Sequence, residues 1–170
     1  KILPQLFHPA HMAFPLPGTP RLIAPSNVGP YYAKEAPRAV TKEELKVIIR
    51  QFGEAAKRAQ IAGADGVEIH AAHAHGLLGG FLSPLYIKRT DEYGGDIDHR
   101  LRLTLEVIEE VRRVCGKNFI IDVRISGSEY TDGGLNLNDM IYVAKQLEKA
   151  GVDFLHVSGG TTIARGSSIP

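Results

Sequence analysis

Apolar residues form short runs, broken by one or two polar residues, in some segments of the chain and recur every three or four positions in others. The short runs have the length of strands, and the periodic segments between them have one apolar helical face. Four runs are expected to be strands, at residues 2–7, 66–69, 119–125 and 152–157. The pattern therefore predicts strands that alternate with helices along most of the chain.

Capping signals mark the ends of three predicted helices. Thr41 and Glu44 form a capping box, in which the side chain of each residue accepts a hydrogen bond from the backbone N–H of the other. The third helix is expected to begin at Asn136 or Asn138, because asparagine oxygens cap helix starts well. Glycine, which readily ends a helix, follows the three helices at Gly63, Gly116 and Gly151.

The punctuation between helices and strands is repeated. The pattern Ala-Gly-Xaa-Asp precedes two predicted strands, at residues 62–65 and 150–153. Such repetition is typical of stacked βα units, which build either a doubly wound sheet or a (β/α)₈ (TIM) barrel. No G-x-G-x-x-G fingerprint follows a strand, which disfavours the dinucleotide-binding sheet, and a full barrel needs roughly 250 residues. We therefore predict an α/β fold in which residues 1–170 form a single partial TIM-barrel domain, the middle of the barrel, with about four parallel strands and three main helices.

Composition narrows the class of protein. The 170 residues are 44% hydrophobic and 23% charged, with a formal net charge of +1, which favours neither nucleic acid nor a membrane surface as a partner. Cys115 is the only cysteine, so it has no internal disulfide partner, and a cytoplasmic location is expected. The chain begins with Lys1 rather than methionine, which suggests a segment of a longer polypeptide.

Residues with useful chemistry follow the predicted strands. Side chains at the carboxyl ends of parallel strands meet at one face of a βα fold. The residues expected there are Gln5, His8, His70, His73, His75, Arg124, Ser126, Ser158, Gly159 and Gly160. This set offers many hydrogen-bond donors and few carboxylates, so it suits an anionic or carbonyl-bearing ligand.

Other interpretations of these residues stay open. His70 and His73 can be structural donors, and Arg124 can be neutralised by Glu68 or Asp122. The spacing His-x-x-His-x-His also resembles a metal site, which makes a metal-dependent barrel hydrolase the second hypothesis. No Asp, Glu or Cys stands at another strand end to complete such a site, so no metal ligand is assigned. A third hypothesis is a non-catalytic segment that serves assembly only.

A long polar segment with glycines follows the histidines, over residues 81–95. Loops of this length in a compact domain are usually functional. Its charged residues, together with one in the next helix, are expected to form ion pairs that order the loop rather than act as catalysts; they are Arg89, Asp91, Glu92 and Arg100.

Taken together, these motifs resemble the Old Yellow Enzyme family of FMN-dependent NADH:flavin oxidoreductases. The resemblance runs from Gln5 to Gly160 and rests on seven motifs in the family's order. They are Gln5-Leu6-Phe7-His8, Ala24-Pro25-Ser26, Gly66-Val67-Glu68-Ile69-His70, Phe81-Leu82-Ser83-Pro84, the segment 89–95, Val123-Arg124-Ile125-Ser126 and His156-Val157-Ser158-Gly159-Gly160. The resemblance implies a (β/α)₈ barrel with FMN across the carboxyl ends of the strands.

The resemblance also implies roles for single residues. Gln5 corresponds to the contact with the flavin pyrimidine edge, and Arg124 lies near flavin N1 and O2, where negative charge develops on reduction. His70 and His73 correspond to the pair that holds the carbonyl or carboxylate oxygen of an α,β-unsaturated small molecule. Reduced NAD(P)H loads the flavin in this family. Ser158 and Gly159 are expected to be further cofactor contacts.

Two features depart from the family's pattern. The tyrosine that usually follows the second histidine as proton donor is missing, and the loop is about one residue longer, so we expect His75 or a water to take the proton's role. The longer loop is similar to that of the 2-enoate and dienoyl reductase branch, whose iron–sulfur cluster lies beyond the barrel and has no cysteine ligands here. A partial barrel would also expose strand edges at residues 2–7 and 152–157. We therefore expect the isolated chain either to form a homo-oligomer through those edges or to be solubilised by a rearranged terminus, and to be inactive alone although its parent protein is active.

Overall fold

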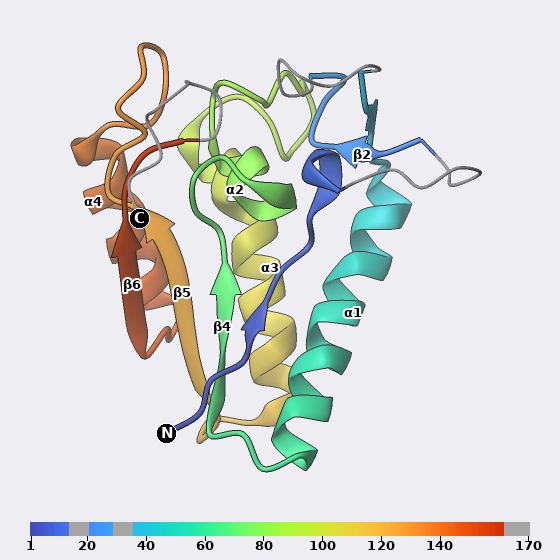
Figure 1. The fold of residues 1–170 in the computed structure, drawn as a ribbon, viewed down its shortest axis with the longest axis vertical. Helices are drawn as coiled ribbons and strands as arrows, with labels where there is room; N and C mark the ends of the chain where they lie inside the picture. Colours follow the sequence, from blue (N-terminus) through green and yellow to red (C-terminus); the bar gives the residue numbers. More distant parts are fainter. Residues whose placement is uncertain (14–20, 29–35, 162–170) are drawn as a thin grey trace.

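The computed structural model describes residues 1–13, 21–28 and 36–161, and four parallel strands form its main sheet. The strands are β1 (Gln5–Leu6), β4 (Gly66–His70), β5 (Ile120–Ser126) and β6 (Phe154–Ser158), in the order β1-β4-β5-β6 (Figure 1). All four lie within the apolar runs of the sequence or overlap them closely. The predicted α/β fold with about four parallel strands is therefore confirmed.

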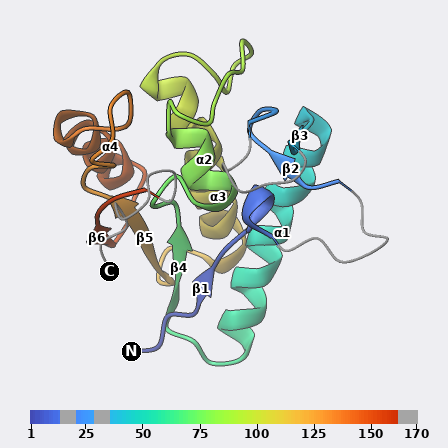
Figure 2. The same ribbon diagram turned by 45° about the horizontal axis from the view of Figure 1, so that its top comes forward.

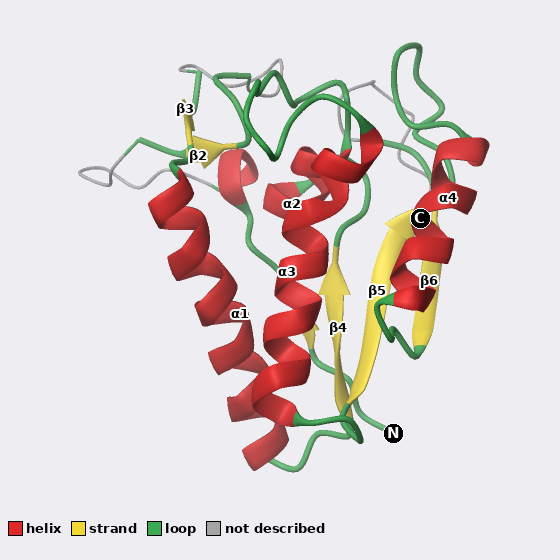
Figure 3. Cartoon of the chain, turned by 180° about the vertical axis from the view of Figure 1, so that it is seen from behind, coloured by secondary structure: helices red, strands yellow, loops and turns green. Residues whose placement is uncertain are grey.

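Three long helices cover one face of this sheet. They are α1 (Lys42–Ile61), α3 (Ile97–Cys115) and α4 (Leu137–Lys149), and all three stand in front of the strands when the molecule is seen from behind (Figure 3). The capping box of Thr41 and Glu44 is present, and Asn136 is the cap that opens α4. The helix starts and the glycine after α3 therefore agree with the sequence pattern.

Strand β1 is shorter than predicted. Only Gln5 and Leu6 have strand geometry, although residues 2–7 form an apolar run. Hydrogen bonds to neighbouring residues extend the pairing, because Asp65 N–H donates to the Ile2 carbonyl at 3.0 Å and Glu68 N–H to the Pro4 carbonyl at 3.0 Å. Pro4 has no N–H of its own, which limits the regular ladder at this end.

A fourth α-helix, α2 (Gly76–Leu82), was not expected. Its glycine-rich sequence has low helix propensity, but every residue of the helix is buried, so tertiary packing overrides propensity. The predicted long loop is therefore helical at its start. The amide of Leu77 donates to the His8 carbonyl at 2.9 Å and ties α2 to the segment after β1.

Small elements surround the carboxyl ends of the strands. A 3₁₀ turn, Ala10–Met12, follows β1, and β2 (Ile23–Ala24) pairs in parallel with β3 (Arg38–Ala39). The sequence pattern gave no sign of this two-residue pairing. Figure 2 shows α2 and these elements gathered above the ends of the main strands.

The hydrophobic core lies between the sheet and the three long helices. Its fully buried members come from β4, β5 and all four α-helices; they include Leu45, Val67, Ile69, Leu77, Leu101, Leu103, Ile108, Ile121, Val123 and Val143. Among the described residues, no helix has the length and apolar character that crossing a lipid bilayer requires.

Candidate active site

The side chains of β4 and β5 alternate between the two faces of the sheet. Val67, Ile69, Ile121 and Val123 are fully buried in the core against the helices. The intervening residues lie on the face that α1, α3 and α4 leave uncovered (Figures 1 and 3). The chemistry predicted at the strand ends therefore gathers on this open face and just above it.

Register places His70 and Arg124 side by side. His70 on β4 pairs with Arg124 on β5, which pairs in turn with His156 on β6. One step below, Gln5, Glu68 and Asp122 stand in a row across β1, β4 and β5. The predicted convergence of Gln5, His70 and Arg124 on one face is thus observed.

His70 is a buried imidazole with spare hydrogen-bonding capacity. It is 8% exposed, and its buried Nδ1 has no partner among the described residues. Burial, and then the neighbouring charges of His75, Arg124 and His73, lower its pKa to about 4. His70 is therefore neutral at pH 7, with one N–H donor and one lone pair to offer a ligand.

His73 is held on both sides of its ring. Nδ1 lies 3.3 Å from the Gly160 carbonyl, which accepts only, so Nδ1 carries the proton. Nε2 then accepts, and it lies 3.0 Å from Ser158 Oγ and 3.4 Å from Arg124 Nη2. Its backbone has φ +62°, a left-handed conformation that a non-glycine residue adopts only when its surroundings enforce it.

The ring of His75 lies beside the ring of His70, and unlike the ring of His73 it has no backbone carbonyl as a hydrogen-bond partner among the described residues. The ring centroids of His70 and His75 are 5.8 Å apart, and Phe7 packs against both, at 4.9 Å from His70 and 5.1 Å from His75. No described residue hydrogen-bonds to the His75 ring. Burial, followed by the charges of His73 and Arg124, lowers the pKa of His75.

The glycine after His75 allows this close approach. Gly76 has φ +67°, and a Cβ at this position would lie 2.4 Å from the Phe7 ring and 2.5 Å from the His8 carbonyl. Any larger residue would separate α2 from β1 and move His75 away from His70. Gly76 therefore contributes to the geometry of the histidine pair.

Arg124 is half-buried and has no carboxylate partner among the described residues. Its two side-chain contacts, to Ser158 Oγ and His73 Nε2, are both 3.4 Å long. A guanidinium has five N–H donors, so most of its capacity is unused. The proposed neutralisation by Glu68 or Asp122 is not observed, and the cation is free to face an acceptor-rich ligand.

Ser158 and Gly159 end β6 next to this cation. Ser158 Oγ lies between Arg124 and His73, and its carbonyl accepts from Gly127 N–H at 2.7 Å. Gly159 packs against Tyr130, whose ring carbon would lie 2.9 Å from a Cβ at this position. Both residues therefore border the open face beside Arg124.

Two polar residues of the open face, Glu68 and His156, were not among the residues expected to form the site. Glu68 contacts Gln5 through a hydrogen bond from Nε2 to Oε1, and its Oε2 lies 2.8 Å from His156 Nδ1. Glu68 lies two residues before His70 on β4 and so shares its face, which was the available signal. A carboxylate in a strand of otherwise apolar character indicates a partner on the same face.

The charged residues after α2 order the loops, as expected. Arg89 pairs with Asp91 at 2.6 Å, and its Nη1 donates to the Val40 carbonyl at 2.7 Å. Arg100 donates to the Leu82 carbonyl at 2.9 Å, and Glu92 pairs with Lys42 at 3.0 Å. These contacts fix the segment over the strand ends.

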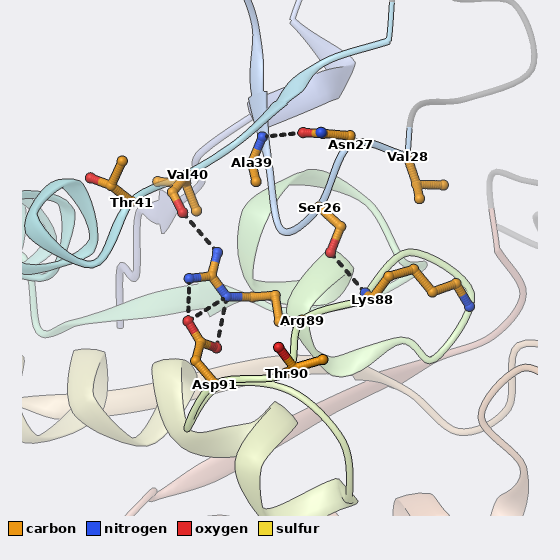
Figure 4. Close-up of a pocket in the computed structure, with 10 residues that line it drawn as sticks. All are labelled: Ser26, Asn27, Val28, Ala39, Val40, Thr41, Lys88, Arg89, Thr90 and Asp91. Atoms are coloured by element: carbon orange, nitrogen blue, oxygen red, sulfur yellow. Dashed lines mark hydrogen bonds and ion pairs between the residues drawn. The ribbon is translucent and has the colours of Figure 1, made fainter.

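A surface pocket lies in this loop region, apart from the histidines (Figure 4). Residues 26–28, 39–41 and 88–91 line it. Several of its polar groups are already paired: Ser26 Oγ accepts from Lys88 N–H at 2.7 Å, and Asn27 Oδ1 accepts from Ala39 N–H at 2.7 Å. These contacts join β2 and β3 to the loop, so we assign the pocket a structural role.

Comparison with known proteins decides the family. The model of the NADH:flavin oxidoreductase / NADH oxidase family matches residues 8–167. The chain belongs to this family. The predicted resemblance to the Old Yellow Enzyme group of flavin oxidoreductases is thereby confirmed.

Curated members of the family are similar over most of the chain. An NADH oxidase of Thermoanaerobacter brockii is 38% identical over 161 residues, which are 94% of this chain and 25% of the relative. An NADPH dehydrogenase of Halalkalibacterium halodurans is 42% identical over 142 residues, 84% of this chain and 41% of the relative. The chain thus spans between a quarter and two fifths of these relatives.

A solved family structure has the same fold. A morphinone reductase in complex with tetrahydroNAD superposes with a TM-score of 0.82 at 30% identity, over 93% of this chain and 48% of its own. The matched part corresponds to a portion of a TIM barrel, as predicted.

Proposed function

We propose that this protein is an FMN-dependent oxidoreductase that uses NAD(P)H to reduce activated C=C bonds in small α,β-unsaturated carbonyl or carboxylate compounds. The observation that carries the proposal is the arrangement on the open face. A guanidinium without a carboxylate partner, Arg124, lies next to neutral imidazoles with unused nitrogens, His70 and His75. Membership of the NADH:flavin oxidoreductase / NADH oxidase family supports the same chemistry.

The residues present fit FMN. Arg124 has unused donors for the acceptor atoms of the ring, and Gln5 offers an amide that can both donate and accept. We propose that Gln5, Arg124, Ser158 and Gly159 hold the cofactor, which when bound supplies hydride transfer. Arg124 would stabilise the negative charge that reduction places on the ring.

Neutral histidines are suited to polarise a substrate oxygen. The closeness of the His70 and His75 rings lets one oxygen accept from both, and each has a lowered pKa and no competing protein partner among the described residues. We propose that His70 and His75 hold the substrate's carbonyl or carboxylate oxygen. Withdrawal of electrons through this oxygen makes the β-carbon receptive to hydride.

His73 has a different environment from the other two. The family resemblance implies His73 as the second oxygen-holding residue, and His75 or a water is the proton donor expected from the sequence. Since both His73 nitrogens have partners in the fold, we propose that His73 holds Arg124 and Ser158 in place. ¹⁵N-histidine NMR tests this assignment of roles. His73 is expected to be the Nδ1–H tautomer, whereas a proton on Nε2 would favour a role for His73 in holding the substrate oxygen.

FMN titration followed by flavin fluorescence tests the function. Saturable binding is expected, and Arg124→Ala should weaken it. Arg113→Ala, which removes an exposed guanidinium paired with Glu110 on α3, is the matched control and should leave the affinity for FMN unchanged. Titration is performed with the protein expressed from its complete reading frame, and absence of binding there would contradict the proposal.

The metal-hydrolase alternative finds no support in the described residues. No group of three or more His, Cys, Asp or Glu side chains there is placed to hold a metal ion. Binding of zinc together with no affinity for FMN would support the metal-dependent hydrolase hypothesis instead.

Assembly and location are further parts of the proposal. We propose that residues 1–170 act as one partial-barrel domain and that the edges at β1 and β6 allow self-association, since an unpaired strand edge can pair with another chain. A single monomeric species at high concentration in sedimentation would count against this. The free thiol of Cys115 supports a cytoplasmic location, which fractionation would test.

A further inference from the structure

A row of polar side chains crosses the open face directly below His70 and Arg124. Gln5 on β1, Glu68 on β4 and Asp122 on β5 are register partners, and His156 on β6 reaches the same carboxylate. The proposed roles of the histidines and Arg124 do not use Glu68, Asp122 or His156. The question is what a carboxylate does at the centre of this row.

Both carboxylate oxygens of Glu68 have a hydrogen-bond partner. Its Oε1 accepts from Gln5 Nε2, and its Oε2 lies 2.8 Å from His156 Nδ1. The Glu68 side chain is 14% exposed, whereas that of His156 is 48% exposed. Burial disfavours the carboxylate, but the bonds from Gln5 and His156 outweigh burial and hold the pKa of Glu68 below its usual value.

An ionised carboxylate accepts hydrogen bonds and cannot donate them. The amide of Gln5 must therefore turn its NH₂ end toward Glu68, which leaves its carbonyl oxygen and one N–H for another partner. Without such a neighbour the two ends of a glutamine amide are nearly interchangeable in shape. The contact with Glu68 selects one of the two orientations.

We propose that Glu68, held by His156, is a positioning residue that fixes the amide of Gln5 in the orientation that binds the flavin pyrimidine. This inference rests on the proposed function. The pyrimidine edge of a flavin presents an N–H between two carbonyls, so the Gln5 oxygen can accept from the N–H while its free N–H donates to a carbonyl. A flipped amide would set its oxygen against the flavin carbonyl and lose both bonds.

Asp122 provides a matched control on the same row. Burial, and then the adjacent charge of Glu68, raise the pKa of Asp122, and its Oδ1 has no partner among the described residues. Its side-chain hydrogen bond is with Glu68, and no hydrogen bond joins it to Gln5 among the described residues. Asp122→Asn is therefore expected to change charge and hydrogen bonding near Glu68 without releasing Gln5.

The first test reads the amide of Gln5 without any cofactor. In ¹⁵N-glutamine NMR of the protein expressed from its complete reading frame, Glu68→Gln should shift the Gln5 side-chain resonances, because glutamine can donate as well as accept. Asp122→Asn should leave them near their original positions. His156→Ala is a second variant, which loosens Glu68 without altering it and should give a smaller shift. Gln5 resonances unmoved by Glu68→Gln would overturn the proposal.

The second test is a double-mutant cycle for FMN binding. Glu68→Gln should raise the Kd for FMN by about threefold to tenfold, the value of one misplaced hydrogen bond. In a Gln5→Ala background the same substitution should have no further effect, since Glu68 acts through Gln5. An equal loss in both backgrounds would assign Glu68 a general structural role and overturn the proposal.

The two failures are distinguishable. If the unaltered protein does not bind FMN, the proposed function fails, and the cofactor-free resonances still decide whether Glu68 orients Gln5. If FMN binds and the cycle is additive, the function stands and the role of Glu68 is refuted.

Discussion

On the face of the sheet that α1, α3 and α4 cover, the side chains of β4 and β5 are apolar and buried, whereas on the opposite face they are polar and partly open. Val67, Ile69 and Ile121 are 0% exposed. Their neighbours in sequence include Glu68, which hydrogen-bonds to His156, and Asp122, an ionisable residue whose pKa is raised. The same strands therefore hold the domain together with one set of residues and arrange the site with the alternate set.

This difference teaches how a strand can be both rigid and chemically specific. Packing of the residues on the helix-covered face fixes the backbone, and the backbone fixes the positions of the side chains on the open face. His70 and Arg124 need no mutual contact to be placed together, because their register is set by the core behind them. Changes to the two faces should consequently have separable effects on stability and on the proposed flavin chemistry.

Ile121→Ala is expected to give the largest loss of stability. Ile121 is fully buried, and truncation of such a residue to alanine costs about 2–5 kcal/mol of unfolding free energy. Urea denaturation would measure this loss. A cost below about 1 kcal/mol would mean that the helix-covered face does not dominate the stability of the fold, and the proposed difference between the two faces would be wrong.

Arg124→Ala should affect chemistry more than stability. Loss of one preorganised group that stabilises developing charge costs about 10²–10³ in rate, or about 2.7–4 kcal/mol of transition-state stabilisation. Stopped-flow measurement of flavin reduction by NAD(P)H, using the protein from its complete reading frame, would show it. A normal rate together with a lowered unfolding midpoint would place Arg124 among the structural residues.

Acid should weaken the fold through two buried histidines. Burial, followed by the charge of His75, lowers the pKa of His11 to about 4, and His70 has a pKa of about 4 as well. An unfolded histidine has a pKa near 6.5, so the unfolded chain takes up protons that the folded chain refuses. Stability should be unaffected above pH 7 and fall as pH drops from 6.5 toward 4, by about 2 kcal/mol per histidine at pH 5.

His11→Phe sharpens this test. His11 is 3% exposed, packs against Tyr86 at 4.6 Å, and has no partner for either nitrogen among the described residues. Phenylalanine retains the ring contact and cannot be protonated. The variant should therefore flatten the dependence of unfolding free energy on pH between 6.5 and 5, and an unchanged slope would exclude His11 as a source.

Thr41→Ala should have the smallest effect. The Thr41 hydroxyl accepts from Glu44 N–H at 3.2 Å and caps α1, and loss of such a cap costs about 1 kcal/mol. Thermal unfolding would detect it, while the affinity for FMN should not change, since α1 lies on the covered face. A change in affinity would show that the two faces are coupled.

The helices and strands that follow simple periodicity were predictable. Caps at Thr41 and Asn136 and an apolar helical face each indicate local structure that packing then reinforces. Helix α2 was missed because Gly79 and Gly80 lower helix propensity, yet a Cβ at Gly79 would lie 2.6 Å from the Ala72 carbonyl. The glycines are there for close packing, which no local pattern reveals.

The site was predictable in its members but not in its contacts. Strand ends placed His70, Arg124 and Ser158 together, since parallel register follows from the fold. Which histidine bonds to which neighbour depends on the left-handed turn at His73 and Ala74, which the sequence does not signal. The role of Glu68 likewise depends on β1 lying next to β4, a pairing between residues far apart in the chain.

The strand order has a consequence for the time course of folding. Strands β5 and β6 are joined by α4 alone, the shortest connection within the main sheet, whereas β1 must find β4 across α1 and all the elements between them. Closing a longer loop costs more entropy and slows its contacts. We expect β5, α4 and β6 to assemble first and β1 to dock last. Because Gln5 arrives with β1, the face proposed to bind flavin is incomplete until β1 docks.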